Sequence, residues 1–135
     1  MKKDLLIILQ KGVKMINLEK ELDGFYGTQM YHWINSQYAC TDGIRKLLTY
    51  FTPRQQDKLI NIFTKLCNYR NLMMFGKIII KNNKVSVITY KDITENGKSY
   101  IDPMYYNDLF TVKDLKDCEI VTMVYNYIWL LLSEY

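Results

Sequence analysis

Three residues that lie near one another in the sequence carry groups that could do covalent chemistry: His32, Cys40 and Asp42. In a cysteine-dependent enzyme the imidazole acts as a base, the thiol as a nucleophile and a carboxylate orients the imidazole. The sequence offers no nucleophile elbow and no pattern for an oxyanion hole around them. We therefore expect His32 and Trp33 to pack under the turn that begins at Thr41, and Thr41 and Asp42 to cap the next helix. The sequence predicts no catalytic residue and a protein that is not an enzyme.

Metal and cofactor chemistry has little support. His32 is the only histidine, so a site with two histidine ligands is excluded. Cys40, Cys67 and Cys118 are widely spaced and form no Cys-x-x-Cys pair, which is the spacing that structural zinc sites use. Glycine-rich dinucleotide and phosphate-loop fingerprints are also absent from the sequence. We expect no metal and no cofactor.

A basic stretch runs from Gly43 to Lys84, where Asp57 is the only acidic residue. Basic side chains can follow a phosphate backbone while aromatic rings stack on unpaired bases. Lysine-rich helices are also common simply as solvated surfaces, so both interpretations stay open. The candidate residues for binding nucleic acid or a partner are Arg45, Lys46, Tyr50, Arg54, Lys58, Lys65, Tyr69 and Arg70.

Tyrosine is unusually frequent, with 12 among 135 residues. Its ring covers a large area at a small entropic cost and keeps a polar tip, which favours interfaces. An A/T-rich genome would also raise the tyrosine content without any such role. The candidate protein interface consists of Tyr100, Tyr105, Tyr106, Tyr125, Tyr127 and Trp129, and a homodimer through these residues stays open.

Charge is unevenly distributed along the chain. The net charge is +4, but residues 1–84 carry +8 and residues 85–135 carry −4. A surface polarised in this way can steer an acidic partner or a nucleic acid towards one side of the molecule.

Length and composition predict one domain over residues 1–135, because 49% of the residues are hydrophobic and 24% are charged. The first half has helical patterns. Asn17 can cap a helix over residues 18–23 that stops at Gly24, and Thr41 precedes an apolar helical face. Thr52 and Pro53 begin a further helix with Gln55 as the third residue of a capping box. Residues 28–34 fit a helix and a strand equally well.

The second half has strand patterns. Residues 73–80 and 85–90 are predicted to pair around a turn at 81–84, and residues 99–106 to return after a turn at Asn96 and Gly97. Residues 120–125 and 128–132 predict a final hairpin around Asn126. The predicted fold class is α+β, with N-terminal helices packed on one face of a C-terminal antiparallel sheet of about four to five strands.

The N-terminus begins with Met1 and two lysines, followed by the apolar run Leu5 to Leu9. The run is too short for a membrane span, and no cleavage site of a signal peptide follows it. An odd number of cysteines fits a reducing cytoplasm, so we expect a cytoplasmic protein of a bacterial host and no membrane partner. Residues 1–14 are a candidate upstream extension, with Met15 as the alternative start.

Four sequence blocks resemble a family of small uncharacterised bacterial and mobile-element proteins. The blocks run from Phe25 to Thr28, from Tyr31 to Trp33, from Thr41 to Gly43, and from Leu130 to Tyr135. The resemblance covers about residues 22–135 and is weak in the middle. Cys40 stands where an aromatic residue is usual and Leu132 where proline is common, and the second helix lacks the family's Tyr-Trp pair. The resemblance implies no activity.

These observations together predict a non-enzymatic binding protein of a phage or mobile element. Its most concrete form is a host-defence inhibitor of the anti-CRISPR type, whose partner is a larger host protein, such as a CRISPR effector nuclease, or the RNA of that effector. Either charged half of the chain could make the contact. The alternative is an accessory protein that binds single-stranded nucleic acid through the basic residues.

Overall fold

We analysed a computed structural model, which describes residues 15–68, 73–91 and 103–135. Within these ranges the helices are α2 (Leu18–Glu21), α3 (Asp42–Leu48), α4 (Pro53–Leu66) and the 3-10 turn η1 (Leu132–Glu134). None of the helices in the described part of the chain is long and apolar enough to cross a membrane. The predicted elements near Leu5, Tyr69, Asn96 and Tyr100 lie outside the described residues.

Each of the three α-helices begins at a side chain that satisfies the free backbone amides of its first turn. Asn17 accepts from two of these amides in α2, and Thr41 accepts from Ile44 in α3. Thr52 and Gln55 form a reciprocal capping box at the start of α4. The three predicted helix starts are confirmed, because a cap depends on neighbouring residues alone.

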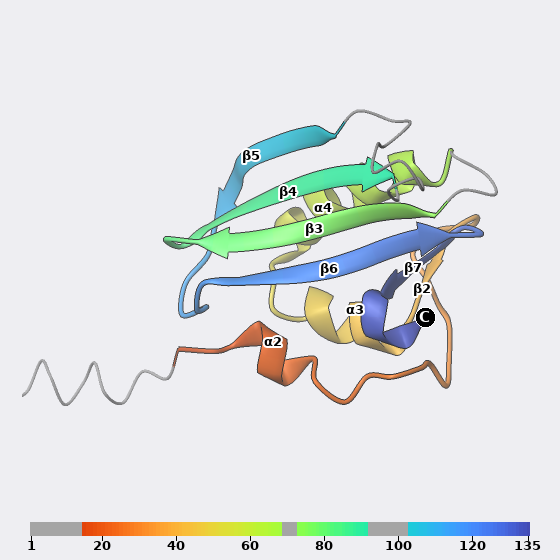
Figure 1. The fold of residues 1–135 in the computed structure, drawn as a ribbon, viewed down its shortest axis with the longest axis horizontal. Coiled ribbons are helices and arrows are strands. Elements are labelled where there is room, and N and C mark those ends of the chain that lie inside the picture. The colour runs from red at the N-terminus through yellow and green to blue at the C-terminus, as the bar shows by residue number, and fades with distance from the viewer. Residues whose placement is uncertain (1–14, 69–72, 92–102) are drawn as a thin grey trace, which may run out of the picture.

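In the described part of the chain, one seven-stranded sheet forms the centre of the fold (Figure 1). Its strands are β1 (His32–Trp33), β2 (Ala39–Cys40), β3 (Met74–Lys81), β4 (Lys84–Lys91), β5 (Met104–Thr111), β6 (Cys118–Tyr125) and β7 (Ile128–Leu131). They lie in the order β1-β2-β7-β6-β3-β4-β5, and every neighbouring pair is antiparallel except β2 and β7, which are parallel. α4 lies behind the central strands, and α2 lies next to β6 (Figure 1).

Two tight turns join the paired strands. Asn82 and Asn83 connect β3 to β4, and Asn126 and Tyr127 connect β6 to β7, all four with positive φ. Two successive positive φ values are the geometry of the two-residue turn whose twist matches that of a hairpin. The predicted hairpins at these two places are confirmed.

The core lies between the sheet and α4. Alternate residues of β3 point towards the helix, including Met74, Ile78 and Ile80. Phe63 of α4 stacks on Trp129 with ring centroids 4.0 Å apart. Packing this close requires a glycine opposite the ring, since a Cβ on Gly76 would lie 2.1 Å from Phe63.

The α+β class is confirmed, but the prediction of four to five strands is wrong. β1 and β2 have two residues each, too few to show an alternating pattern, so the sequence did not reveal them. The helices are also not all on one face, because α2 lies at the edge of β6. Of the third predicted strand, the structure describes β5 from Met104 onwards, which continues to Thr111, and residues 99–102 lie outside the described residues.

Candidate functional site

His32 lies between a carboxylate and a guanidinium. Its Nε2 is 2.7 Å from Asp42 Oδ1, and its Nδ1 is 2.8 Å from Arg45 Nη1. Because arginine has donors only, Nδ1 must accept from Arg45, and the proton of the neutral ring must then sit on Nε2 and point at Asp42. Both ring nitrogens are engaged. In this arrangement His32 has no free lone pair with which to accept a proton from a nucleophile.

Cys40 lies opposite His32 in the β1–β2 pair, but its side chain is only 3% exposed. Burial raises the pKa of the Cys40 thiol to about 11. Burial also raises the pKa of Cys67 and of Cys118 to about 11. A thiol with such a pKa is almost entirely protonated at neutral pH, and the thiolate is the nucleophilic form. His32 and Asp42 therefore come together and Cys40 lies beside them in the strand pairing, but the Cys40 thiol is buried and protonated at neutral pH.

Asp42 holds the segment before β1 against the start of α3. Its Oδ2 accepts from the backbone N of Gln29 at 2.9 Å, while its own N–H donates to Thr28 Oγ1 at 3.0 Å. The backbone N–H of Gln29 and the side chain of His32 hold the pKa of Asp42 below its usual value. Asp42 is thus kept ionised and acts as an anchor.

Glu134, near the C-terminal end of the sequence, binds the start of α3 as well. Its carboxylate accepts from the Thr41 hydroxyl at 2.6 Å, from the Gly43 N–H at 3.1 Å and from the Leu131 N–H at 3.0 Å. Gly43 permits this approach, since a Cβ there would lie 2.5 Å from Glu134 Oε1. The carboxylate supports the first turn of α3, where backbone N–H groups lack helical partners.

The four sequence blocks that carry the family resemblance therefore meet at one point. Ser133 Oγ donates to the carbonyl of Phe25 at 2.7 Å and joins the first block to the last, while Asp42 joins the second to the third. The polar residues of these blocks are therefore explained by the hydrogen bonds that they form within the fold. We call this network the α3 anchor, formed by Thr28, His32, Thr41, Asp42, Gly43, Arg45 and Glu134.

Large hydrophobic side chains project outwards around the α3 anchor. They are between 58% and 75% exposed and comprise Tyr26, Met30, Tyr31, Trp33 and Tyr135, which we call the aromatic surface. The expectation that Trp33 packs under the Thr41 turn is wrong, since it is 75% exposed. Its neighbour His32 does contact that turn, through Asp42. This surface was not expected from the sequence, although aromatic residues among Gly, Asn and Ser, without a helical or strand period, are typical of an exposed irregular segment.

A cavity of about 290 Å³ opens beside the aromatic surface. Tyr31, Tyr125 and Tyr135 line it together with Glu134 and Asn126. The cavity therefore adjoins both the α3 anchor, through Glu134, and the aromatic surface, through Tyr31 and Tyr135.

The predicted interface tyrosines lie on separate parts of the sheet, some on the edge strand β5 and some at the turn between the central strands β6 and β7. Tyr105 is exposed and Tyr106 half-buried on β5, at the edge opposite β1, whereas Tyr125 and Tyr127 lie at the β6–β7 turn. Trp129 is 2% exposed and stacked on Phe63, so it belongs to the core and not to an interface. Tyr100 lies outside the described residues.

The predicted basic residues also differ in their surroundings. Arg45 contacts His32, Lys46 lies 5.4 Å from the centre of the Tyr50 ring, and the Tyr50 hydroxyl donates to Glu21. Lys58 donates to the carbonyl of Leu109. Arg54 and Lys65 are exposed on α4 and form no ion pair with the described part of the chain, and Tyr69 and Arg70 lie outside it.

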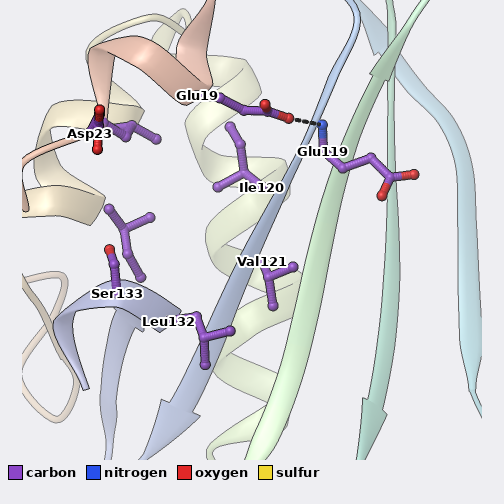
Figure 2. A pocket seen from close by; sticks show the side chains of 9 residues that line it. Glu19, Asp23, Glu119, Ile120, Val121, Leu132 and Ser133 are labelled. Carbon is purple, nitrogen blue, oxygen red and sulfur yellow. Dashed lines mark hydrogen bonds between the residues drawn. The ribbon is translucent and has the colours of Figure 1, made fainter.

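A second hollow, of about 420 Å³, lies between α2 and β6 (Figure 2). β7 pairs only with residues 122–125 of β6, so the first half of β6 has α2 beside it instead of a strand. Glu19 accepts from the Glu119 N–H at 3.0 Å, and the Glu119 side chain points away from α2 (Figure 2). Glu119 pairs with Lys77 at 3.4 Å. α2 therefore shields an open strand edge, as sheet proteins commonly require.

Among the described residues, no group of three or more His, Cys, Asp or Glu side chains is placed to hold a metal ion. Comparison of the chain with protein-family models, with curated proteins and with solved structures gives no match. The functional assignment therefore rests on the chemistry of the surface itself.

Proposed function

We propose that this chain works by binding a larger protein through the aromatic surface, without catalysing a reaction. The observation that carries the proposal is the exposure of Tyr26, Met30, Tyr31, Trp33 and Tyr135 around one anchored segment. Exposed aromatic and methionine side chains of this kind are enriched at protein interfaces and supply most of the binding energy there.

The anchoring of this segment supports the same proposal. Gln29, between Tyr26 and Trp33, is bonded through its backbone to Asp42, and Phe25 is bonded through its carbonyl to Ser133. A segment ordered before binding loses less conformational entropy when the complex forms. These hydrogen bonds hold an exposed segment in one conformation, which is what a docking surface requires.

The partner that we propose is a host defence protein that a phage or mobile element would inhibit. An RNA-guided effector nuclease is the first such protein to test. An inhibitor of this kind needs a stable docking surface and no reactive group. The α3 anchor is consistent with that requirement, since it holds His32 and Asp42 in hydrogen bonds within the chain.

The decisive experiment compares three forms of the full chain: wild type, Tyr26→Ala with Trp33→Ala, and the matched control Met104→Ala with Tyr105→Ala. The control removes two exposed hydrophobic side chains at the opposite edge of the sheet. Wild type and control should hold the purified nuclease or a stoichiometric host protein equally, and the aromatic variant at least about tenfold more weakly. A missing stoichiometric partner would refute the proposal, and so would weakening by the control alone.

Binding of single-stranded nucleic acid is the second candidate. The observation in its favour is that Arg54 and Lys65 are exposed on α4 without an ion pair among the described residues. Reversing both charges (Arg54→Glu with Lys65→Glu) should abolish a salt-sensitive association with single-stranded RNA, because each phosphate contact adds to the salt dependence. Binding that is absent in the wild type, or that ignores salt, would remove this candidate.

A further inference from the structure

We infer that the cavity beside the aromatic surface binds the cationic side chain of a lysine or arginine that the partner presents. This inference rests on the proposed function and names the chemistry of one contact within it. Three tyrosines and one carboxylate line the cavity: Tyr31, Tyr125, Tyr135 and Glu134. Aromatic faces combined with a carboxylate are the surroundings that alkylammonium and guanidinium groups prefer.

The faces of the three rings are not used by the fold. Within the described residues, Tyr31, Tyr125 and Tyr135 form neither a ring contact nor a side-chain hydrogen bond. Tyr125 is half-buried, and its ring makes no contact with another ring or a cation among the described residues, so the ring face is open to a guest.

The charge of the cavity favours a cation. Glu134 lies in its wall and is held in place by three donors, two on Oε1 and one on Oε2. A carboxylate has about four lone-pair positions, so one position on Oε2 stays open. Among the residues that the structure describes, no lysine or arginine lines the cavity, and the amide of Asn126 adds an acceptor for an N–H group.

The size of the cavity also selects one side chain. A volume of about 290 Å³ lies at the lower limit of sites for drug-sized ligands and suits a single side chain. Tyr31 and Tyr135 belong both to the cavity and to the aromatic surface, so the guest would enter from the docked partner.

The test uses the full chain labelled with ¹⁵N and two capped peptides, Gly-Gly-Lys-Gly-Gly and its norleucine analogue, at constant ionic strength. The lysine peptide should shift the amide resonances of Asn126 and Glu134, and the norleucine peptide should not. Tyr135→Leu should weaken the lysine peptide about 3- to 30-fold, whereas Tyr135→Phe should retain binding, because the ring face and not the hydroxyl attracts the cation. Tyr135 is 71% exposed, so neither substitution threatens the fold.

Equal shifts with both peptides, or no shift at Asn126 and Glu134, would overturn the inference. The proposed function fails by a different result, namely partner binding that survives Tyr26→Ala with Trp33→Ala. Binding that is lost with that double substitution but unchanged by Tyr135→Leu refutes the cavity alone.

Discussion

Replacing Glu134 tests whether the α3 anchor holds the aromatic surface in place. Glu134→Ala removes the acceptor of three hydrogen bonds, from Thr41, Gly43 and Leu131. Thr41 is 2% exposed and Gly43 is buried, so water cannot easily replace the carboxylate for these two donors. A hydrogen bond to a charged group contributes at least about 1.5 kcal/mol. The free energy of unfolding should therefore fall by about 3 to 4 kcal/mol.

Urea denaturation followed by circular dichroism measures this loss. A chain of this size has a slope near 1.5 kcal/mol per molar urea, so the midpoint should fall by about 2 M. Glu134→Gln should lose roughly half as much, because its amide oxygen can replace one carboxylate oxygen while its NH₂ faces a donor. The matched control is Glu119→Ala, which removes a carboxylate in an exposed ion pair with Lys77 and should cost less than about 1 kcal/mol.

A loss below about 1 kcal/mol for Glu134→Ala would contradict this expectation, because it would mean that water satisfies the donors or that the anchor is not formed. A second outcome is that Glu134→Ala loses the expected stability while the fluorescence emission of the exposed Trp33 stays unchanged under native conditions. In that case Glu134 supports α3 without positioning the aromatic surface.

Three further outcomes follow from packing and charge. Gly76→Ala should destabilise the fold by about 2 kcal/mol or more, seen as a lower melting temperature, because the new methyl group meets the Phe63 ring at 2.1 Å. Cys40, whose pKa burial raises to about 11, should react with iodoacetamide at pH 8 about 100-fold more slowly than a model thiol, and at the model rate in urea. The pKa of Asp42 is lowered on folding, above all by the Gln29 N–H, so the ionised carboxylate should stabilise the fold above about pH 4 and lose this effect as the pH falls further. Denaturation curves of Asp42→Asn at several pH values should lack this pH-dependent part.

The parts of the fold that depend on neighbouring residues could be predicted from the sequence. The caps at Asn17, Thr41 and Thr52 and the turns at Asn82 and Asn126 each need only a few adjacent side chains. β1 and β2 could not be predicted, because they exist only through pairing with each other and with β7, which lies far along the chain. Their two residues each carry no pattern of their own.

Only the contact between His32 and the turn at Thr41 could be predicted from the sequence, and the bonds of Glu134 and the exposed side chains could not. Proximity in sequence suggested that His32 contacts the turn at Thr41. The structure shows this contact as the hydrogen bond between His32 and Asp42. Glu134 reaches the same turn from about 90 residues away, and Trp33 points outwards while Trp129 points into the core. Both tryptophans lie beside apolar residues in the sequence, so only the register of the sheet separates them.

The contrast between the α3 anchor and the aromatic surface carries the functional argument. Polar groups that could do chemistry, His32 and Asp42, are engaged with one another and with Arg45. Hydrophobic groups that a fold would normally bury, such as Tyr26 and Trp33, are left in solvent. A surface held in place by hydrogen bonds and covered with aromatic rings loses less conformational entropy on docking, and this is the physical support for the binding role that we propose.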